Sequence, residues 1–91
     1  MRLSQEQVAQ ELQHMTGWQW IGDAIRKEFI FRDFTQSVAF VDRMVEPANT
    51  MDHHPDVDIR YNRVQVTLTT HDQGGVTEKD LQLAKQLDAL S

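Results

Sequence analysis

Hydrophobic residues follow helical spacing in three segments of the chain and alternate with polar residues in four others. In the first helical segment, Val8, Leu12 and Met15 recur at intervals of four and three residues, which places them on one face of a helix. Ser4 fits the N-cap of a capping box. Gly17 predicts the end of this helix, because glycine is common where helices stop.

The four alternating segments are rich in β-branched and aromatic residues, which supports strands over helices. Strands are expected over residues 18–20, 25–31, 57–61 and 64–69. Gly22-Asp23 predicts a turn between the first two strands. A turn near Asn62-Arg63 joins the last two, although one bent strand is the alternative there. Strands joined by turns this short should be antiparallel.

The middle helix carries the widest hydrophobic stripe. Asp33 or Thr35 can begin it. Its stripe, with spacings of four, three, four and three, consists of Phe34, Val38, Val41, Val45 and Ala48. Phe40 and Met44 widen the hydrophobic surface, so this helix, over residues 34–48, is either simply well buried or also packs on another subunit. Pro47 predicts that the helix kinks or ends nearby.

The last helix follows a turn over residues 71–75. Thr77 can begin it, with Asp80 at the third helical position, and leucines continue to Leu90. The resulting order of elements, α-β-β-α-β-β-α, predicts a single α+β domain over residues 1–91. We expect two layers, with helices covering one face of an antiparallel sheet.

Composition narrows the possible functions. The formal net charge is -5 and the basic residues are scattered, which argues against a nucleic-acid partner. No hydrophobic run is long enough to cross a membrane, and residues 1–7 do not resemble a signal peptide, so a cytoplasmic location is expected. The chain has 91 residues and no cysteine, so a small core without disulfides would gain stability most naturally by self-association.

The stretch MDHHPDV, residues 51–57, contains two of the four histidines. Neighbouring residues in an extended segment point to opposite sides, so His53 and His54 reach one metal ion only if the backbone turns between them. The sequence therefore argues against a metal site. Histidine titrates near neutral pH and can transfer protons, so the pair could act in acid–base chemistry. A solvated loop without a function is the alternative, and spacing alone favours it.

The position of His71 favours acid–base chemistry over a solvated loop for the histidine pair. If the last two strands pair as a hairpin about Asn62, His53 and His54 lie about as far before the turn as His71 lies after it. Three histidines would then gather at one end of the sheet. His14, on the polar side of the first helix, is expected to be solvated.

The segment from Asp52 to Ala84 resembles the signature region of the pterin-4a-carbinolamine dehydratase family. The family pattern is His-His-Pro, then an aromatic residue, a later histidine and an aspartate in the last helix. Its counterparts here are His53-His54-Pro55, Tyr61, His71 and Asp80. Gly17-Trp18 and FRDF at residues 31–34 extend the similarity over nearly the whole chain.

The resemblance implies a dehydratase that removes water from a 4a-hydroxy-tetrahydropterin. The product is a quinonoid dihydropterin, in the recycling of the cofactor of aromatic amino acid hydroxylases. No metal and no cofactor is implied, because the pterin is the substrate. The implied catalytic residues are His53 and His71 as acids and His54, which would hold the pterin and assist. The positions that line the family's pterin pocket are Asp52, Thr69 and Thr70.

The resemblance also implies a four-stranded antiparallel sheet with three helices on one side, and a homodimer or homotetramer. This chain departs from the family pattern at Asn49, where an acidic or other ionisable residue is common, and at Val57, where tryptophan is frequent. The rival function is that of a non-enzymatic binding protein with the same fold. Such relatives act as a transcription cofactor or as an assembly chaperone.

Overall fold

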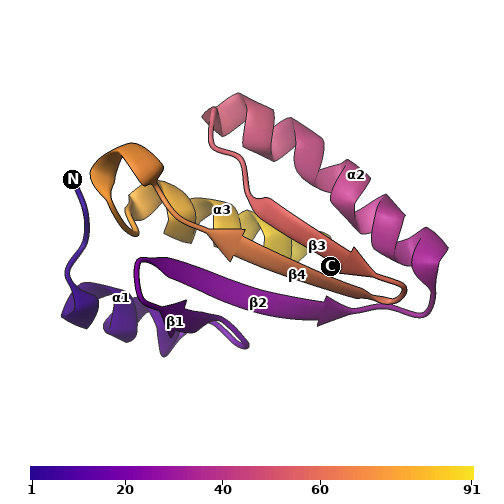
Figure 1. Cartoon of the computed structure of the whole chain (residues 1–91), viewed down its shortest axis with the longest axis horizontal. Coiled ribbons are helices and arrows are strands. Elements are labelled where there is room, and N and C mark those ends of the chain that lie inside the picture. Colours follow the sequence, from indigo (N-terminus) through magenta and orange to yellow (C-terminus); the bar gives the residue numbers. More distant parts are fainter.

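The computed structural model describes the whole chain, Met1–Ser91. Its elements are α1 (Gln5–Leu12), β1 (Gln19–Ile21), β2 (Ala24–Ile30), α2 (Phe34–Met51), β3 (Asp56–Arg60), β4 (Arg63–Leu68), the 3-10 helix η1 (His71–Gln73) and α3 (Glu78–Leu90). The strands form one antiparallel sheet in the order β1-β2-β4-β3. In Figure 1, α3 lies behind the sheet and α2 lies beside β3. The predicted fold class is therefore confirmed.

The sheet separates a hydrophobic face from a polar one. In the register of β2 and β4, Ile25 pairs with Leu68 and Phe29 pairs with Val64. All four side chains are buried. Successive residues of a strand point to opposite faces, so the alternate side chains of Arg26, Glu28, Gln65 and Thr67 face away from the core. One continuous hydrophobic core takes residues from each of the three helices, which is why the helices cover a single face of the sheet.

The buried face of α2 includes only part of its predicted hydrophobic surface. The core-facing residues are Ser37, Phe40, Met44 and Ala48. By contrast, Phe34, Val38 and Val45 are 53%, 43% and 52% exposed, so the alternative of a helix that is simply well buried is wrong for these three residues. The reason is aromatic packing, because the ring of Phe40 lies 4.7 Å from that of Phe29 and 5.0 Å from that of Phe31 between centroids.

The observed ends of the helices can be compared with the predicted capping and stop residues. The capping box of α1 is confirmed, with Ser4 Oγ accepting from the Gln7 amide at 3.1 Å. The helix ends at Leu12 instead of Gly17, and a tight turn, in which the Met15 amide donates to the Leu12 carbonyl, then brings Met15 into the core. α2 does not end at Pro47 but continues to Met51.

The connection between β3 and β4 is a two-residue turn, because Arg60 pairs with Arg63. The hairpin is therefore confirmed, and the alternative of one bent strand is wrong. The turn consists of Tyr61 and Asn62, one residue earlier than predicted. Tyr61 lies there at a φ of 50° and is 64% exposed.

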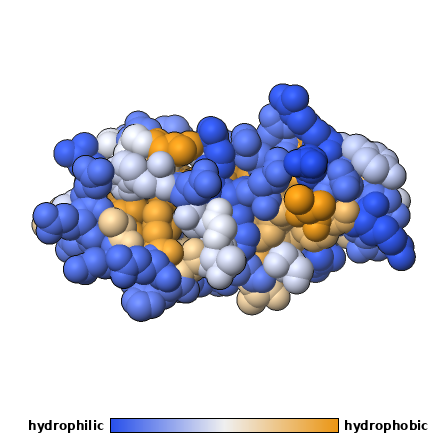
Figure 2. Space-filling model, turned by 90° about the horizontal axis from the view of Figure 1, so that it is seen from below, coloured by the Kyte–Doolittle hydropathy of each residue, from blue (hydrophilic) through white to orange (hydrophobic).

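One side of the molecule has a mostly polar surface. Seen from the side of β1 and β2, hydrophilic residues dominate and hydrophobic patches are separate from one another (Figure 2). At the edge of the core, Asp88 of α3 accepts hydrogen bonds from the Trp18 indole at 3.1 Å and from the Lys27 ammonium at 2.8 Å. None of the helices combines the length and the hydrophobicity that crossing a membrane requires.

Candidate active site

The end of α2 reverses the chain immediately before the histidine pair. Asp52 takes the left-handed conformation, with φ 51° and ψ 44°. The His53 amide donates to the Ala48 carbonyl at 3.0 Å, and the Asp52 amide donates to the Asn49 carbonyl at 3.1 Å. These two bonds define a Schellman motif, which usually places glycine where Asp52 stands. The reversal leaves His53 in the protein interior, where it is only 8% exposed.

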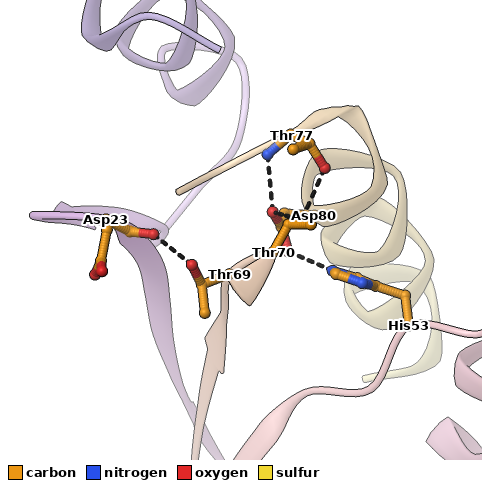
Figure 3. A network of polar contacts seen from close by, with 6 residues as sticks. All are labelled: Asp23, His53, Thr69, Thr70, Thr77 and Asp80. Atoms are coloured by element: carbon orange, nitrogen blue, oxygen red, sulfur yellow. Dashed lines mark hydrogen bonds and ion pairs between the residues drawn. The ribbon is translucent and has the colours of Figure 1, made fainter. Parts of the chain in front are cut away.

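The His53 ring meets the carboxylate of Asp80 from the first turn of α3. His53 Nε2 lies 2.5 Å from Asp80 Oδ1, and Asp80 is completely buried. An ionised carboxylate can only accept hydrogen bonds, so His53 Nε2 carries the hydrogen toward an ionised Asp80. Nδ1 is then the ring nitrogen left for another partner (Figure 3).

The second oxygen of Asp80 joins the end of β4 to the same network. Asp80 Oδ2 accepts from Thr70 Oγ1 at 2.8 Å and from the Thr77 amide at 2.9 Å. Thr70 Oγ1 also lies 2.8 Å from Thr77 Oγ1. A buried carboxylate is costly unless it is fully hydrogen-bonded, and these contacts supply that compensation. They also show that the hairpin brings the start of β3 and the end of β4 together.

His54 faces a different environment from its neighbour. It is exposed, and its Nε2 lies 2.7 Å from Asn49 Oδ1 on the last turns of α2. The two rings therefore contact different elements, as expected for adjacent residues in an extended segment. The chain has no group of three or more His, Cys, Asp or Glu side chains arranged to hold a metal ion.

Thr69 and His71 stand on either side of Thr70. Thr69 Oγ1 donates to the carbonyl of Asp23 at 2.5 Å, so the turn between β1 and β2 borders this end of the sheet (Figure 3). His71 is the first residue of η1 and is exposed. A hollow of about 510 Å³ lies beside the first residues of the chain, and Thr70 is the one predicted site residue among those that line it.

The pairing of Asp80 with His53 was not predicted from the sequence. Asp80 stood out only as a capping residue and as part of a family pattern, and 27 positions separate it from His53. Capping is a local signal, whereas this contact depends on where α3 packs. Asp23 left no signal beyond a turn, because its contact with Thr69 uses a backbone carbonyl.

The arrangement suits proton transfer. A buried carboxylate that holds one nitrogen of an imidazole fixes the orientation and the tautomer of the ring. The opposite nitrogen of His53 can then give or take a proton at a bound molecule. His54 and His71, both exposed, supply two more titratable groups in the adjoining segments.

Comparisons with known proteins agree on one family. The family model described as Pterin 4 alpha carbinolamine dehydratase matches residues 1–90. Two relatives bear that dehydratase's name provisionally. The one from Thermosynechococcus vestitus is 48% identical over 99% of this chain and 95% of its own length. The one from Sulfurisphaera tokodaii is 46% identical over 98% of this chain and 96% of its own length.

Two solved structures extend this result. A transcriptional coactivator/pterin dehydratase from Brucella melitensis superposes with a TM-score of 0.94 at 37% identity, over 99% of this chain and 98% of its own. A pterin dehydratase-like protein described as a RuBisCO assembly factor in the alpha-carboxysome has a TM-score of 0.70 at 25% identity, over 85% of this chain and 92% of its own.

Proposed function

The chain belongs to the pterin 4 alpha carbinolamine dehydratase family, and we propose that it removes water from a 4a-hydroxy-tetrahydropterin by histidine acid–base catalysis. The product would be a quinonoid dihydropterin. Such a reaction would serve the recycling of the tetrahydropterin cofactor of aromatic amino acid hydroxylases.

The reaction needs one proton delivered and one removed. Hydroxide is a poor leaving group, so an acid must protonate the 4a-hydroxyl as the C4a–O bond breaks and water departs. The proton on N5 must then leave as the new double bond forms. Positioned acids and bases typically contribute about 10²–10⁴-fold to such steps. Neither proton transfer requires a metal or a cofactor.

The contact between His53 and Asp80 is the observation that carries this proposal. Burying a carboxylate that accepts three hydrogen bonds has a high energetic cost. A solvated loop without a function would not need such a contact. It orients His53 as an acid or base at the end of the sheet. We assign the second acid to His71.

The remaining predicted residues have supporting roles in the proposal. His54 would hold the pterin, with its ring oriented by Asn49. Asp52 and Thr69 would line the pterin site on either side of the hairpin. Thr70 would support the pterin site through Asp80, because its hydroxyl donates to the carboxylate of Asp80.

The test is the rate at which a 4a-hydroxy-tetrahydropterin, formed in situ by a hydroxylase, loses water with and without the protein. His53→Ala and His71→Ala should each slow the catalysed reaction by about 10²-fold or more, as is typical for the loss of a general acid or base. His14→Ala is the matched control, because His14 is exposed and outside the site. Full rates in both site variants while they remain folded would exclude the mechanism.

We also propose that the protein is a homodimer or homotetramer that uses α2. Phe34, Val38 and Val45 form an exposed hydrophobic stripe on this helix, and a second copy would remove it from water. Sedimentation equilibrium should show a smaller species for Val45→Asp than for the unmodified protein. Glu46→Ala, one residue away and exposed, should leave the mass unchanged. A monomeric unmodified protein would refute this assembly.

The same stripe supports a second candidate function, that of a non-enzymatic binding protein. Two solved relatives, one described as a transcriptional coactivator/pterin dehydratase and one as an assembly factor, support this second function. It would stand if the unmodified protein does not accelerate dehydration and retains its fold. The dehydration assay therefore decides between the two functions.

A further inference from the structure

The first residues of the chain lie across the loop that carries His71. The Leu3 amide donates to the Val76 carbonyl at 2.8 Å, and the Arg2 guanidinium donates through Nη1 to the Gly74 carbonyl at 3.3 Å. Figure 1 shows the N-terminal end of the chain beside the segment that leads from β4 to α3. Seventy-two positions separate Arg2 from Gly74, so only the tertiary structure brings them together.

The loop beneath Arg2 is closed at its base. Thr70 and Gly75 form an isolated bridge, in which the Thr70 amide donates to the Gly75 carbonyl at 3.0 Å. Inside the loop, the Gly74 amide donates to the His71 carbonyl at 3.1 Å. His71 therefore sits in a small ring of backbone hydrogen bonds, and any movement of the ring relative to the sheet carries His71 with it.

Gly75 allows Arg2 to lie directly on this ring. A Cβ atom at Gly75 would be 2.4 Å from Arg2 Cδ and 2.9 Å from Arg2 Cγ, which is much closer than carbon atoms approach without bonding. The methylene groups of Arg2 thus occupy the space that a side chain at position 75 would need. The guanidinium then reaches the carbonyl of the preceding residue.

We propose that Arg2 is a positioning residue, which holds the Thr70–Gly75 loop against the sheet and so places His71 for proton transfer. The inference rests on the proposed dehydratase function and adds a residue outside the site. Arg2 does not touch the reacting atoms. Its effect on the rate comes through the loop, because small displacements of a catalytic group reduce rates strongly.

The experiment combines two substitutions that act on the same contact. Arg2→Ala removes the side chain, and Gly75→Ala expels it, since the new methyl group takes its place. Each should speed hydrogen exchange at the amides of Thr70 and Gly74 and lower kcat by roughly tenfold, less than the ~10²-fold that a 1 Å misplacement can cost, with a smaller change in KM. The double variant should be no worse than either single one.

Two further variants separate positioning from general loss of structure. Arg2→Lys keeps the methylene groups and one charged donor, so it should restore most of kcat. Arg60→Ala removes another arginine with a side chain that is 81% exposed, at the far end of the hairpin, and should leave exchange and kcat unchanged.

Unchanged exchange at Thr70 and Gly74 in Arg2→Ala would overturn the inference. Additive losses in the double variant would also overturn it, because Gly75 would then act independently of Arg2. The exchange measurement needs no substrate. If the unmodified protein has no dehydratase activity, faster exchange in Arg2→Ala would still show that Arg2 orders the loop, and the proposed function alone would fail.

Discussion

Replacing Asp80 by asparagine tests the role of the buried network directly. Asparagine has nearly the same shape, so its carbonyl oxygen can keep accepting from Thr70 and from the Thr77 amide. Its NH₂ group then faces His53 Nε2, where the unmodified protein has Asp80 Oδ1 at 2.5 Å. Two donors cannot share one hydrogen bond. His53 must therefore move its hydrogen to Nδ1 and accept at Nε2.

The magnitude follows from the three bonds of Asp80. Hydrogen bonds to charged groups contribute about 1.5–3 kcal/mol and neutral ones about 0.5–1.5, while removing the buried charge recovers part of this loss. We expect a net loss of about 1–3 kcal/mol in the free energy of unfolding. At roughly 4–8 °C per kcal/mol for a domain of this size, a 2 kcal/mol loss lowers Tm by about 8–16 °C.

The effect on catalysis should exceed the effect on stability. A buried aspartate that fixes the tautomer of a catalytic histidine can be worth about 10⁴-fold in kcat. For Asp80→Asn we expect a loss of about 10²–10⁴-fold in kcat, because His53 then presents the wrong tautomer to the substrate. The tautomer is measured by ¹⁵N NMR of the imidazole, and stability by urea unfolding at one fixed protein concentration.

Asp88→Asn is the matched control for these measurements. Asp88 lies two turns further along α3 and binds Trp18 and Lys27 instead of a histidine. This variant should lose stability and keep the His53 tautomer and kcat. The reasoning fails if Asp80→Asn keeps its hydrogen on Nε2, or if it turns over substrate at the original rate.

Three further predictions concern single substitutions elsewhere in the chain. Asp52→Gly should raise the free energy of unfolding by up to about 1 kcal/mol, since glycine is unstrained in the left-handed conformation, yet raise KM if the carboxylate binds the pterin; a lower midpoint in urea would contradict the first part. Thr70→Val should cost about 1–3 kcal/mol by removing a buried donor to Asp80, with Thr70→Ser restoring it, and equal urea midpoints for the two variants would rule this out. Phe40→Ala should cost about 3–5 kcal/mol, whereas Val45→Ala, at a half-exposed position, should cost under about 0.5 kcal/mol in the isolated chain; the reverse order would contradict the burial of Phe40 and the exposure of Val45.

Helices and strands were predictable because their signals are local. Spacing of hydrophobic residues, capping residues and short turns specify an element within a few positions of the chain. The capping box at Ser4 and the turn at Gly22-Asp23 are both present in the structure. The hairpin then followed from the pairing of adjacent strands, and it placed His53 near Thr70.

The face that α2 buries was not predictable in the same way. Its hydrophobic residues occupy two neighbouring stripes, and spacing alone does not rank them. Phe40 is buried because two aromatic rings of the sheet side meet it, and that choice depends on the position of the whole helix. The exposed stripe is consequently left for another surface to cover.

The sequence by itself determined the order of elements, the hairpin and the residues that carry the family pattern. Only the tertiary structure decided which histidine is buried and what holds it. His53 turns inward because Asp52 reverses the chain at the end of α2, and Asp80 meets it because α3 packs behind the sheet. Such contacts depend on three-dimensional placement, because their energy comes from groups far apart in the chain that are buried together.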